Sequence, residues 1–395
     1  MYKEIKKDIR YIGVDDTTLD LFEGQYIIPE GVSYNSYVIM DEKIAIMDTA
    51  DARKTDEWMK NLDEALEGRT PDYVVVLHME PDHAGSLKEV LDKYPSMKVV
   101  GNTKTFLFMG QFFDMDIEDR KVVVEEGDVL DLGSHQLTFV NAPMVHWPEV
   151  MVAYDSESKV LFAADGFGKF GALNDEIILS DISTWSCEAR RYYFNIVGKY
   201  GAQVQALLKK AAALDIEMIC PLHGPVLADD LEFFINKYDT WSSYKPEDKG
   251  VLVAYASIHG NTAKAAKKMA ELLKEAGEAK VATTDLTRDD MAEAIEDAFR
   301  YDRIILAASS YDAGVFTPMD VFLNRLAHKG YRNRTLAIIE NGTWAPTAAR
   351  KMKEIIATMK DINLIEDVIT IKSSMSEVNL EQMKGLAQIL VDYKN

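Results

Sequence analysis

The chain has 395 residues, enough for two or three domains that each bury a hydrophobic core. Hydrophobic residues make up 47% and charged residues 28%, proportions that are typical of a soluble globular protein and exclude a disordered or fibrous one. The formal net charge is −21, and this acidity disfavours binding to nucleic acids and to anionic lipid surfaces. We therefore expect a globular protein that binds neither nucleic acid nor membrane.

The cysteine content and the N-terminus indicate the compartment. The two cysteines, Cys187 and Cys220, form no Cys-x-x-Cys motif, so the sequence supports neither a disulfide framework nor a thiolate metal site. The charged N-terminus lacks the apolar core of a signal peptide, and no run of about 18 apolar residues occurs. These features predict a cytoplasmic protein.

In chain order, the first part of the sequence predicts short strands mixed with helices. Strand-forming segments fall at 34–40, 43–48, 73–77 and 121–124. Charged helical patterns fall at about 53–66, 86–94, 187–213 and 228–241, and Ser86 is a candidate cap for the second of these helices. Because strands and helices do not alternate regularly, the pattern favours an α/β sandwich.

Turn-forming and charged residues at 241–250 predict a linker, and a different pattern follows it. Apolar strands now alternate with helices, which predicts a doubly wound parallel sheet of about 145 residues. We expect one domain at 1–245 and a second at 250–395. The predicted strands lie at 250–255, 303–308, 335–339 and 364–372, and the predicted helices at 262–276, 319–328 and 346–359.

Metal-binding side chains gather after apolar segments of the first part. Four of them occur within six residues, directly after the strand at 73–77. Such a group would be costly to bury without a partner, so the sequence predicts a metal site, with room for two metals and one bridging carboxylate. The candidate ligands are His78, Glu80, Asp82, His83, His146, Asp165 and His223.

The H-x-E-x-D-H run, followed by a distant His, Asp and His, resembles the metallo-β-lactamase fold in the variant seen in flavodiiron proteins, or A-type flavoproteins. The resemblance implies an N-terminal αββα sandwich with a non-haem diiron site. It implies that His78, Glu80 and His146 bind one iron, that Asp82, His83 and His223 bind the other, and that Asp165 bridges them. Hydrolases of this fold usually have His at the position of Glu80, and a carboxylate there suits iron better than zinc.

The loop at 255–262 follows the first strand of the second part and opens a helix, so its hydroxyls and backbone N–H groups form a phosphate cradle. It resembles the FMN-phosphate loop of flavodoxins. Two later loops follow strands, at the sheet edge where a flavin ring would bind, and Tyr311 and Trp344 are suited to stack on or edge the ring. The candidate FMN-binding residues are Ser257, Ile258, His259, Gly260, Asn261, Thr262, Ser310, Tyr311, Asp312, Ala313, Gly314, Asn341, Gly342, Thr343 and Trp344.

Some residues match a motif without its context. The run 166–171 matches G-x-G-x-x-G, but no apolar helix follows, so we expect its glycines to let the backbone pass close to the metal pocket and not to bind a dinucleotide. His135 and His328 lie outside every cluster, and we expect neither to be a ligand. By resemblance, Tyr193 matches a tyrosine near the diiron site and is the candidate catalytic residue, while Glu23 stands where many relatives have His.

Together these features imply, by resemblance, a flavodiiron oxidoreductase. Electrons would pass from an external donor through FMN to a diiron site that reduces O2 to water, NO to N2O, or both. The sequence has no further cysteine-containing module, so we expect a separate rubredoxin-like donor, and the resemblance implies a head-to-tail homodimer or a dimer of dimers. Two other functions stay open: a dinuclear zinc hydrolase with a flavodoxin-like accessory domain, and an electron carrier whose first domain is structural.

Overall fold

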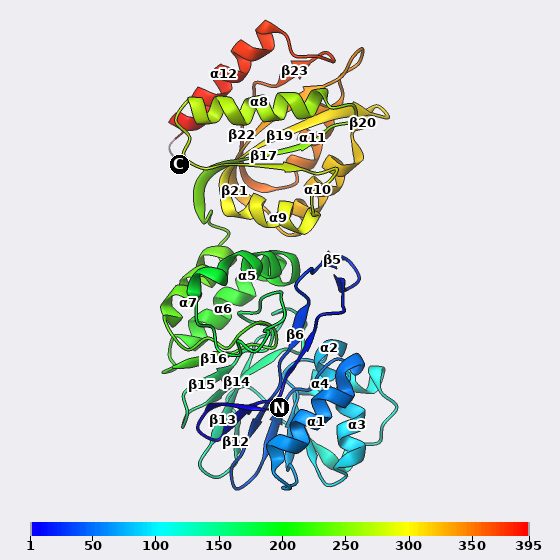
Figure 1. The fold of residues 1–395 in the computed structure, drawn as a ribbon, viewed down its shortest axis with the longest axis vertical. Helices are drawn as coiled ribbons and strands as arrows, with labels where there is room; N and C mark the ends of the chain where they lie inside the picture. The colour runs from blue at the N-terminus through cyan, green and yellow to red at the C-terminus, as the bar shows by residue number, and fades with distance from the viewer. Residues whose placement is uncertain (1, 394–395) are drawn as a thin grey trace. The chain divides into compact units, whose positions relative to one another are not determined.

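The computed structural model describes residues 2–393 and divides into two compact units, Met1–Asp239 and Thr240–Asn395 (Figure 1). The first unit is a mixed α/β sandwich and the second is a doubly wound parallel sheet, so the predicted fold class is confirmed. Within residues 2–393, no helix combines the length and the apolar character needed to cross a membrane.

Two sheets form the N-terminal unit. The first has the strand order β1-β2-β7-β8-β9-β10-β11, in which β8 to β11 run parallel, and the second has the order β12-β13-β14-β15-β16, in which β15 and β16 run parallel. The first sheet contains β1 (Lys3–Lys6), β2 (Ile9–Tyr11), β7 (Tyr37–Ile39), β8 (Ala45–Met47), β9 (Tyr73–Val75), β10 (Lys98–Gly101) and β11 (Lys121–Val123). The second contains β12 (Val129–Asp131), β13 (Gln136–Asn141), β14 (Met151–Asp155), β15 (Val160–Phe162) and β16 (Met218–Cys220).

Helices cover both sheets. Strands β7, β8, β15 and β16 are buried along their whole length, as expected where each sheet has covered faces. Helix α1 contacts β7 and α4 contacts β10, whereas α5 to α7 lie near β14 to β16 in Figure 1. The helices are α1 (Thr55–Leu66), α2 (Pro81–Ala84), α3 (Leu87–Lys93), α4 (Thr103–Phe112), α5 (Ser186–Tyr192), α6 (Gly201–Ala211) and α7 (Leu231–Ser242). Two small ribbons pair β3 (Val14–Asp16) with β6 (Val32–Tyr34) and β4 (Leu21–Phe22) with β5 (Tyr26–Ile27).

The C-terminal unit is built on parallel strands in the order β18-β17-β19-β21-β22, with β23 also beside β21. This is the strand order of flavodoxin-like sheets, which bind their ligand beyond the carboxyl ends of the strands. Helices α8 and α12 pack together on one face, and α10 packs with α9 and α11 on the other (Figure 1). The strands are β17 (Asp248–Ala256), β18 (Val281–Asp285), β19 (Tyr301–Tyr311), β20 (Gly314–Val315), β21 (Arg332–Asn341), β22 (Lys360–Leu364) and β23 (Ile369–Ile371). The helices are α8 (Asn261–Glu275), α9 (Met291–Arg300), α10 (Thr317–His328), α11 (Ala348–Ile356) and α12 (Glu377–Asp392).

Three local features differ from the predicted elements. The helix predicted at 187–213 is interrupted, because α5 passes into a π-helical turn at Tyr193–Val197 and a 3₁₀ turn at Gly198–Tyr200 before α6 begins. Ser86 precedes α3 but does not cap it with its side chain, since its hydroxyl bonds to the hydroxyl of Thr55 at 2.8 Å. Of the strand predicted at 364–372, the structure has β23 at Ile369–Ile371, while β22 ends at Leu364, where the predicted strand begins.

Candidate metal centre and flavin pocket

The candidate metal ligands lie where strands of both sheets end. Residue 78 follows β9, and its position is fixed by Asp48, whose carboxylate accepts the backbone N–H groups of Leu77 and His78 at 2.8 and 3.2 Å. Pro81 opens α2, which places Asp82 and His83 together on one short turn. The remaining ligands lie in the loops that follow β13, β15 and β16, so the two sheets bring distant parts of the sequence to one place.

The first group of side chains comprises His78, Glu80, His146 and Asp165, whose ligand atoms lie within 4.8 Å of one another. Nε2 of His146 lies 2.9 Å from Oε2 of Glu80 and 3.0 Å from Oδ2 of Asp165. Nε2 of His78 lies 3.2 Å from the same Glu80 oxygen and 3.5 Å from the same Asp165 oxygen. Two imidazole nitrogens and two carboxylate oxygens therefore face one point.

The second group comprises Asp82, His83 and His223. Nε2 of His83 lies 3.0 Å from Nε2 of His223, and these atoms lie 3.4 and 3.2 Å from Oδ2 of Asp82. Oδ1 of Asp165 faces this group, at 3.2 Å from His83 and 3.9 Å from His223. Asp165 thus directs one oxygen to each group, which is the placement that a bridging carboxylate requires.

Hydrogen bonding within the cluster is incomplete. Asp82, His83 and Asp165 are at most 9% exposed, yet the four carboxylate oxygens and Nδ1 of His83 have no hydrogen-bond partner among the described residues. Buried acceptors without donors are costly, and two imidazole nitrogens 3.0 Å apart repel each other unless a proton or a cation lies between them. A pair of divalent cations would satisfy these atoms, and the mixed oxygen and imidazole donors suit iron or zinc.

The charges of the cluster shift its pKa values strongly. Burial lowers the pKa of His146, but the close carboxylates of Asp165 and Glu80 outweigh this effect and raise it to about 9. For Asp165 burial has the opposite effect and would raise the pKa, but the imidazoles of His78, His146 and His83 hold it well below its usual value. Without a metal, protons on the imidazoles therefore balance the negative charge of the carboxylates. Metal binding would have to release these protons.

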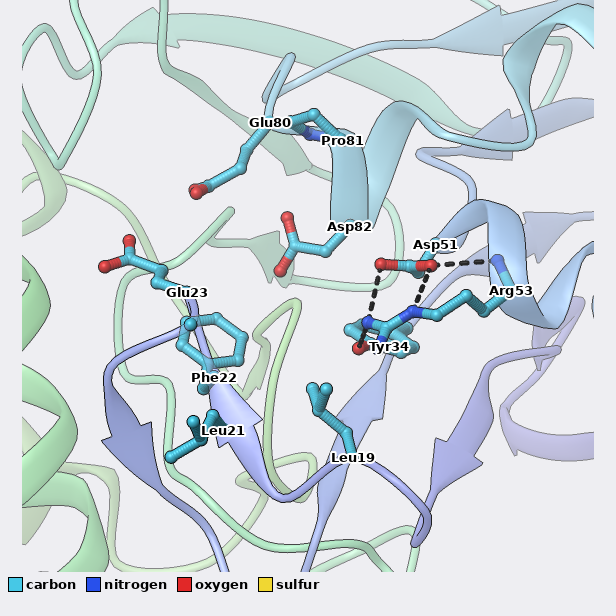
Figure 2. Close-up of a pocket in the computed structure, with 11 residues that line it drawn as sticks. Leu19, Leu21, Phe22, Glu23, Tyr34, Asp51, Arg53, Glu80, Pro81 and Asp82 are labelled. Carbon is cyan, nitrogen blue, oxygen red and sulfur yellow. Dashed lines mark hydrogen bonds and ion pairs between the residues drawn. The ribbon is translucent and has the colours of Figure 1, made fainter.

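A cavity of about 390 Å³ opens beside this cluster, and Glu80 and Asp82 form part of its wall (Figure 2). Glu23, on the β4–β5 hairpin, points into the same cavity. Partial burial and the nearby carboxylate of Glu80 raise the pKa of Glu23. Across the cavity, Asp51 accepts two hydrogen bonds of 2.9 Å from the guanidinium of Arg53. The cavity wall is therefore rich in carboxylates, and its one cation is already paired.

Two adjacent tyrosines occupy different environments. Tyr193 packs its ring against Phe194 and Tyr238, with ring centroids 5.1 Å apart in both pairs. The ring of Tyr192 lies 5.5 Å from that of His223, and its buried hydroxyl has no hydrogen-bond partner among the described residues. Burial raises the pKa of Tyr192 well above its usual value, and the nearby charge of Asp165 adds to this effect. Sequence reasoning missed Tyr192, because neighbouring aromatic residues on a helix give no signal for which one faces a site.

The structure places the glycine run beside the metal cluster, and among the described residues His135 and His328 belong to neither ligand group. A Cβ on Gly168 would lie 2.8 Å from Cε1 of Tyr192, so the absence of a side chain lets the backbone pass close to the metal cluster. His135 lies away from the cluster and donates from Nδ1 to Asp155 at 2.7 Å. His328 is an exposed residue at the end of α10.

In the C-terminal unit, the three predicted loops line one cavity of about 640 Å³. Gly260 adopts φ +88° at the start of α8, and its N–H donates to the hydroxyl of Ser257 at 3.1 Å, which shapes the predicted phosphate loop. Trp344 is 90% exposed and Tyr311 is 47% exposed, so both rings lie open at this cavity. The lining residues are Ser257, Ile258, His259, Asn261, Thr262, Ser309, Ser310, Tyr311, Asp312, Ala313, Asn341, Gly342, Thr343, Trp344, Ala345, Thr347 and Ser373.

Gly260 and Gly314, two of the predicted residues, shape the loops but are not among those that line the cavity. Conversely, Ser309, Ala345, Thr347 and Ser373 were not predicted. Ser373 reaches the cavity from beyond β23, where its hydroxyl lies 2.9 Å from that of Thr343. No local motif marks such a residue, because it depends on the pairing of β23 with β21.

Comparisons with known proteins agree with this architecture. Residues 32–224 match the family described as ODP family beta lactamase, and residues 252–364 match a flavodoxin domain. The chain is 28% identical to an uncharacterized protein of Methanocaldococcus jannaschii, over 99% of this chain and 98% of that protein. It is also 28% identical to the anaerobic nitric oxide reductase flavorubredoxin of Aliivibrio fischeri, over 86% of this chain and 69% of that protein.

Solved structures with the same fold cover almost the whole chain. The rubredoxin oxygen:oxidoreductase from Desulfovibrio gigas is 25% identical with a TM-score of 0.90, over 99% of this chain and 98% of that chain. The flavodiiron protein from Giardia intestinalis is 25% identical with a TM-score of 0.92, over 99% of this chain and 96% of that chain. Over almost its whole length the chain is therefore similar to solved structures of a rubredoxin oxygen:oxidoreductase and of a flavodiiron protein.

Proposed function

We propose that this protein is an oxidoreductase that passes electrons from an external donor through FMN to a non-haem diiron site, where O2 is reduced to water, NO to N2O, or both. The observation that carries the proposal is Asp165, whose two oxygens face two groups of buried metal-binding side chains. The flavodoxin-type cavity on the same chain supplies the place for FMN. The names of the relatives, an oxygen oxidoreductase and a nitric oxide reductase, support both gases as substrates.

In this proposal His78, Glu80 and His146 hold one iron, Asp82, His83 and His223 hold the other, and Asp165 bridges them. When bound, the iron pair supplies the redox centre for the gas. The three carboxylates give the site a hard, anionic character that suits iron in more than one oxidation state. Tyr192 contributes a buried hydroxyl on a ring that lies 5.5 Å from the ring of His223, while the role predicted for Tyr193 stays a prediction.

The C-terminal loops would hold FMN in the way the sequence predicts. The backbone N–H groups at the start of α8, with Ser257 and Thr262, would bind the phosphate, because the N-terminus of a helix favours anions. Tyr311 and Trp344 would flank the ring, and Asn341, Gly342 and Thr343 would reach its polar edge. Bound FMN supplies one-electron transfer.

Donor, assembly and location complete the proposal. The names rubredoxin oxygen:oxidoreductase and flavorubredoxin support a rubredoxin-type donor. We further propose a cytoplasmic, head-to-tail homodimer, which would place the FMN of one subunit beside the iron site of the other. Sedimentation tests the dimer: full activity of a dilute sample that sediments as a monomer would contradict it.

The experiment that tests the function is consumption of O2, or of NO in the absence of O2, by the iron-loaded, FMN-loaded protein with an artificial reductant. His83→Ala should abolish gas consumption, because it removes a side chain that faces both Asp165 and His223. His135→Ala is the matched control, since this histidine is also buried and bonded to a carboxylate but lies outside the cluster. Equal turnover by His83→Ala and wild type would contradict the proposal.

A further inference from the structure

Glu149 is a buried carboxylate that belongs to neither ligand group. It lies between His146 and β14, and its side chain is fully buried. Its Oε1 accepts a hydrogen bond from Nδ1 of His78 at 2.8 Å and another from the backbone N–H of Met79 at 3.0 Å. The side chain of Asn102 donates to the backbone carbonyl of Glu149 at 2.6 Å and holds this segment in place. Glu149 is therefore held against Nδ1 of His78, which we call the outer nitrogen because the other ring nitrogen, Nε2, faces the cluster.

This contact determines how His78 faces the cluster. Because a carboxylate only accepts, the proton on the ring lies on Nδ1, and Nε2 is left to face Glu80 and Asp165 at 3.2 and 3.5 Å. A carboxylate on the outer nitrogen also increases the electron density of the imidazole, which makes its inner nitrogen a better ligand. Glu149 therefore affects both the orientation and the donor strength of His78.

The second group lacks an equivalent carboxylate. Nδ1 of His223 donates to the backbone carbonyl of Ser33 at 2.7 Å, which orients the ring but brings no charge. Nδ1 of His83 is buried and has no hydrogen-bond partner among residues 2–393. The outer nitrogens in the second group thus meet a neutral carbonyl or no hydrogen-bond partner, whereas that of His78 meets a carboxylate.

We infer that Glu149 makes the two metal positions unequal, so that the position formed by His78, Glu80 and His146 binds its metal more tightly than the one formed by Asp82, His83 and His223. The inference rests on the dinuclear centre proposed above and adds a difference between its two halves. Glu149 is a positioning residue in this account, because it acts only through His78.

Metal affinity tests this directly, without reliance on turnover. Metal-free protein is titrated anaerobically with Fe²⁺ against a competing chelator, and bound iron per chain is measured by elemental analysis. Wild type should fill in two steps. Glu149→Gln keeps an acceptor oxygen and the shape of the side chain but removes the charge, so it should weaken the tighter step by about 10- to 100-fold and leave the weaker step in place.

Asp155→Asn is the matched control, because Asp155 is an equally buried carboxylate bonded to His135, which lies outside the cluster. It should leave both binding steps unchanged. Glu149→Gln with wild-type affinity in both steps, or with both steps weakened equally, would overturn the inference.

Ligand variants test the order of the two steps without a change at Glu149. His223→Ala should remove the weaker step and keep the tighter one, and His146→Ala should do the reverse. The opposite pattern would overturn the inference even if the Glu149 variant failed to fold. A wild-type chain that binds fewer than two irons would instead refute the dinuclear centre itself, so the two failures are distinguishable.

Discussion

Replacing Tyr192 with phenylalanine removes a single buried oxygen atom beside the proposed diiron site. The hydroxyl has no hydrogen-bond partner among the described residues, and a buried polar group without a partner costs about 1–3 kcal/mol. In metal-free protein, Tyr192→Phe should therefore raise the free energy of unfolding by about 1 kcal/mol, measured by denaturant unfolding. Its ring contacts with His223 and Phe170 are retained, so no cavity forms.

Turnover should change in the opposite direction. If this hydroxyl donates a hydrogen bond to the reacting gas, its loss should lower kcat by about 10²-fold, a typical effect of removing one donor from a reaction site. The assay is consumption of O2, or of NO in the absence of O2, by protein with matched iron and FMN content. A more stable but slower enzyme is the combined signature that we predict.

Tyr193→Phe is the matched control, because this residue is the next one along the helix and is also fully buried. Its ring packs on Tyr238 and Phe194, so kcat should stay within about twofold of wild type. Full turnover by Tyr192→Phe together with a large loss in Tyr193→Phe would refute the geometric argument and favour the residue indicated by the family resemblance.

Three further predictions follow from single contacts. Gly168→Ala should lower the free energy of unfolding by about 1–3 kcal/mol, because its Cβ would lie 2.8 Å from the ring of Tyr192. Gly110→Ala has open space around its Cβ and should not destabilise the protein. Denaturant unfolding of both variants tests this, and equal stability of the two would contradict it. Trp344→Ala should raise the Kd for FMN by roughly two- to tenfold in a fluorescence titration and leave the unfolding of FMN-free protein unchanged, and an unchanged Kd would exclude ring stacking. The hydrogen bond to Asp155 raises the pKa of His135, and although burial would raise the pKa of Asp155, the bond from His135 lowers it. The stabilisation by this pair is then lost above the raised His135 pKa and below the lowered Asp155 pKa. The difference in free energy of unfolding between wild type and Asp155→Asn should therefore be largest between about pH 4 and 6.5. A difference independent of pH would contradict this.

The ligand set could be predicted because each residue follows an apolar strand. Strands end at predictable places, and parallel strands such as β15 and β16 deliver the residues that follow them to the same edge. The proximity of Asp165 and His223 follows from that rule, whereas His78 follows β9 of the other sheet and meets them only because the two sheets pack together. The flavin loops obey it as well, since they follow β17, β19 and β21.

Residues that contact the ligands without binding the metal themselves could not be predicted in this way. Glu149 meets His78 because the segment before β14 folds back against the loop after β9, and this contact joins positions 71 residues apart. Tyr192 is the last residue of α5, and the helix changes to a π-helical turn directly after it at Tyr193–Val197, so adjacent Tyr192 and Tyr193 belong to different helical geometries. The sequence shows only a helical pattern there, and buried packing decides where it breaks.

The most direct test of the central claim is the metal and flavin content of anaerobically purified protein from iron-replete cells, measured by elemental analysis and by absorbance of the released flavin. The two ligand groups that share Asp165 and the flavodoxin-type cavity predict about two irons and one FMN per chain. Zinc in place of iron, found consistently in such preparations, would contradict the proposed reductase and favour a hydrolase.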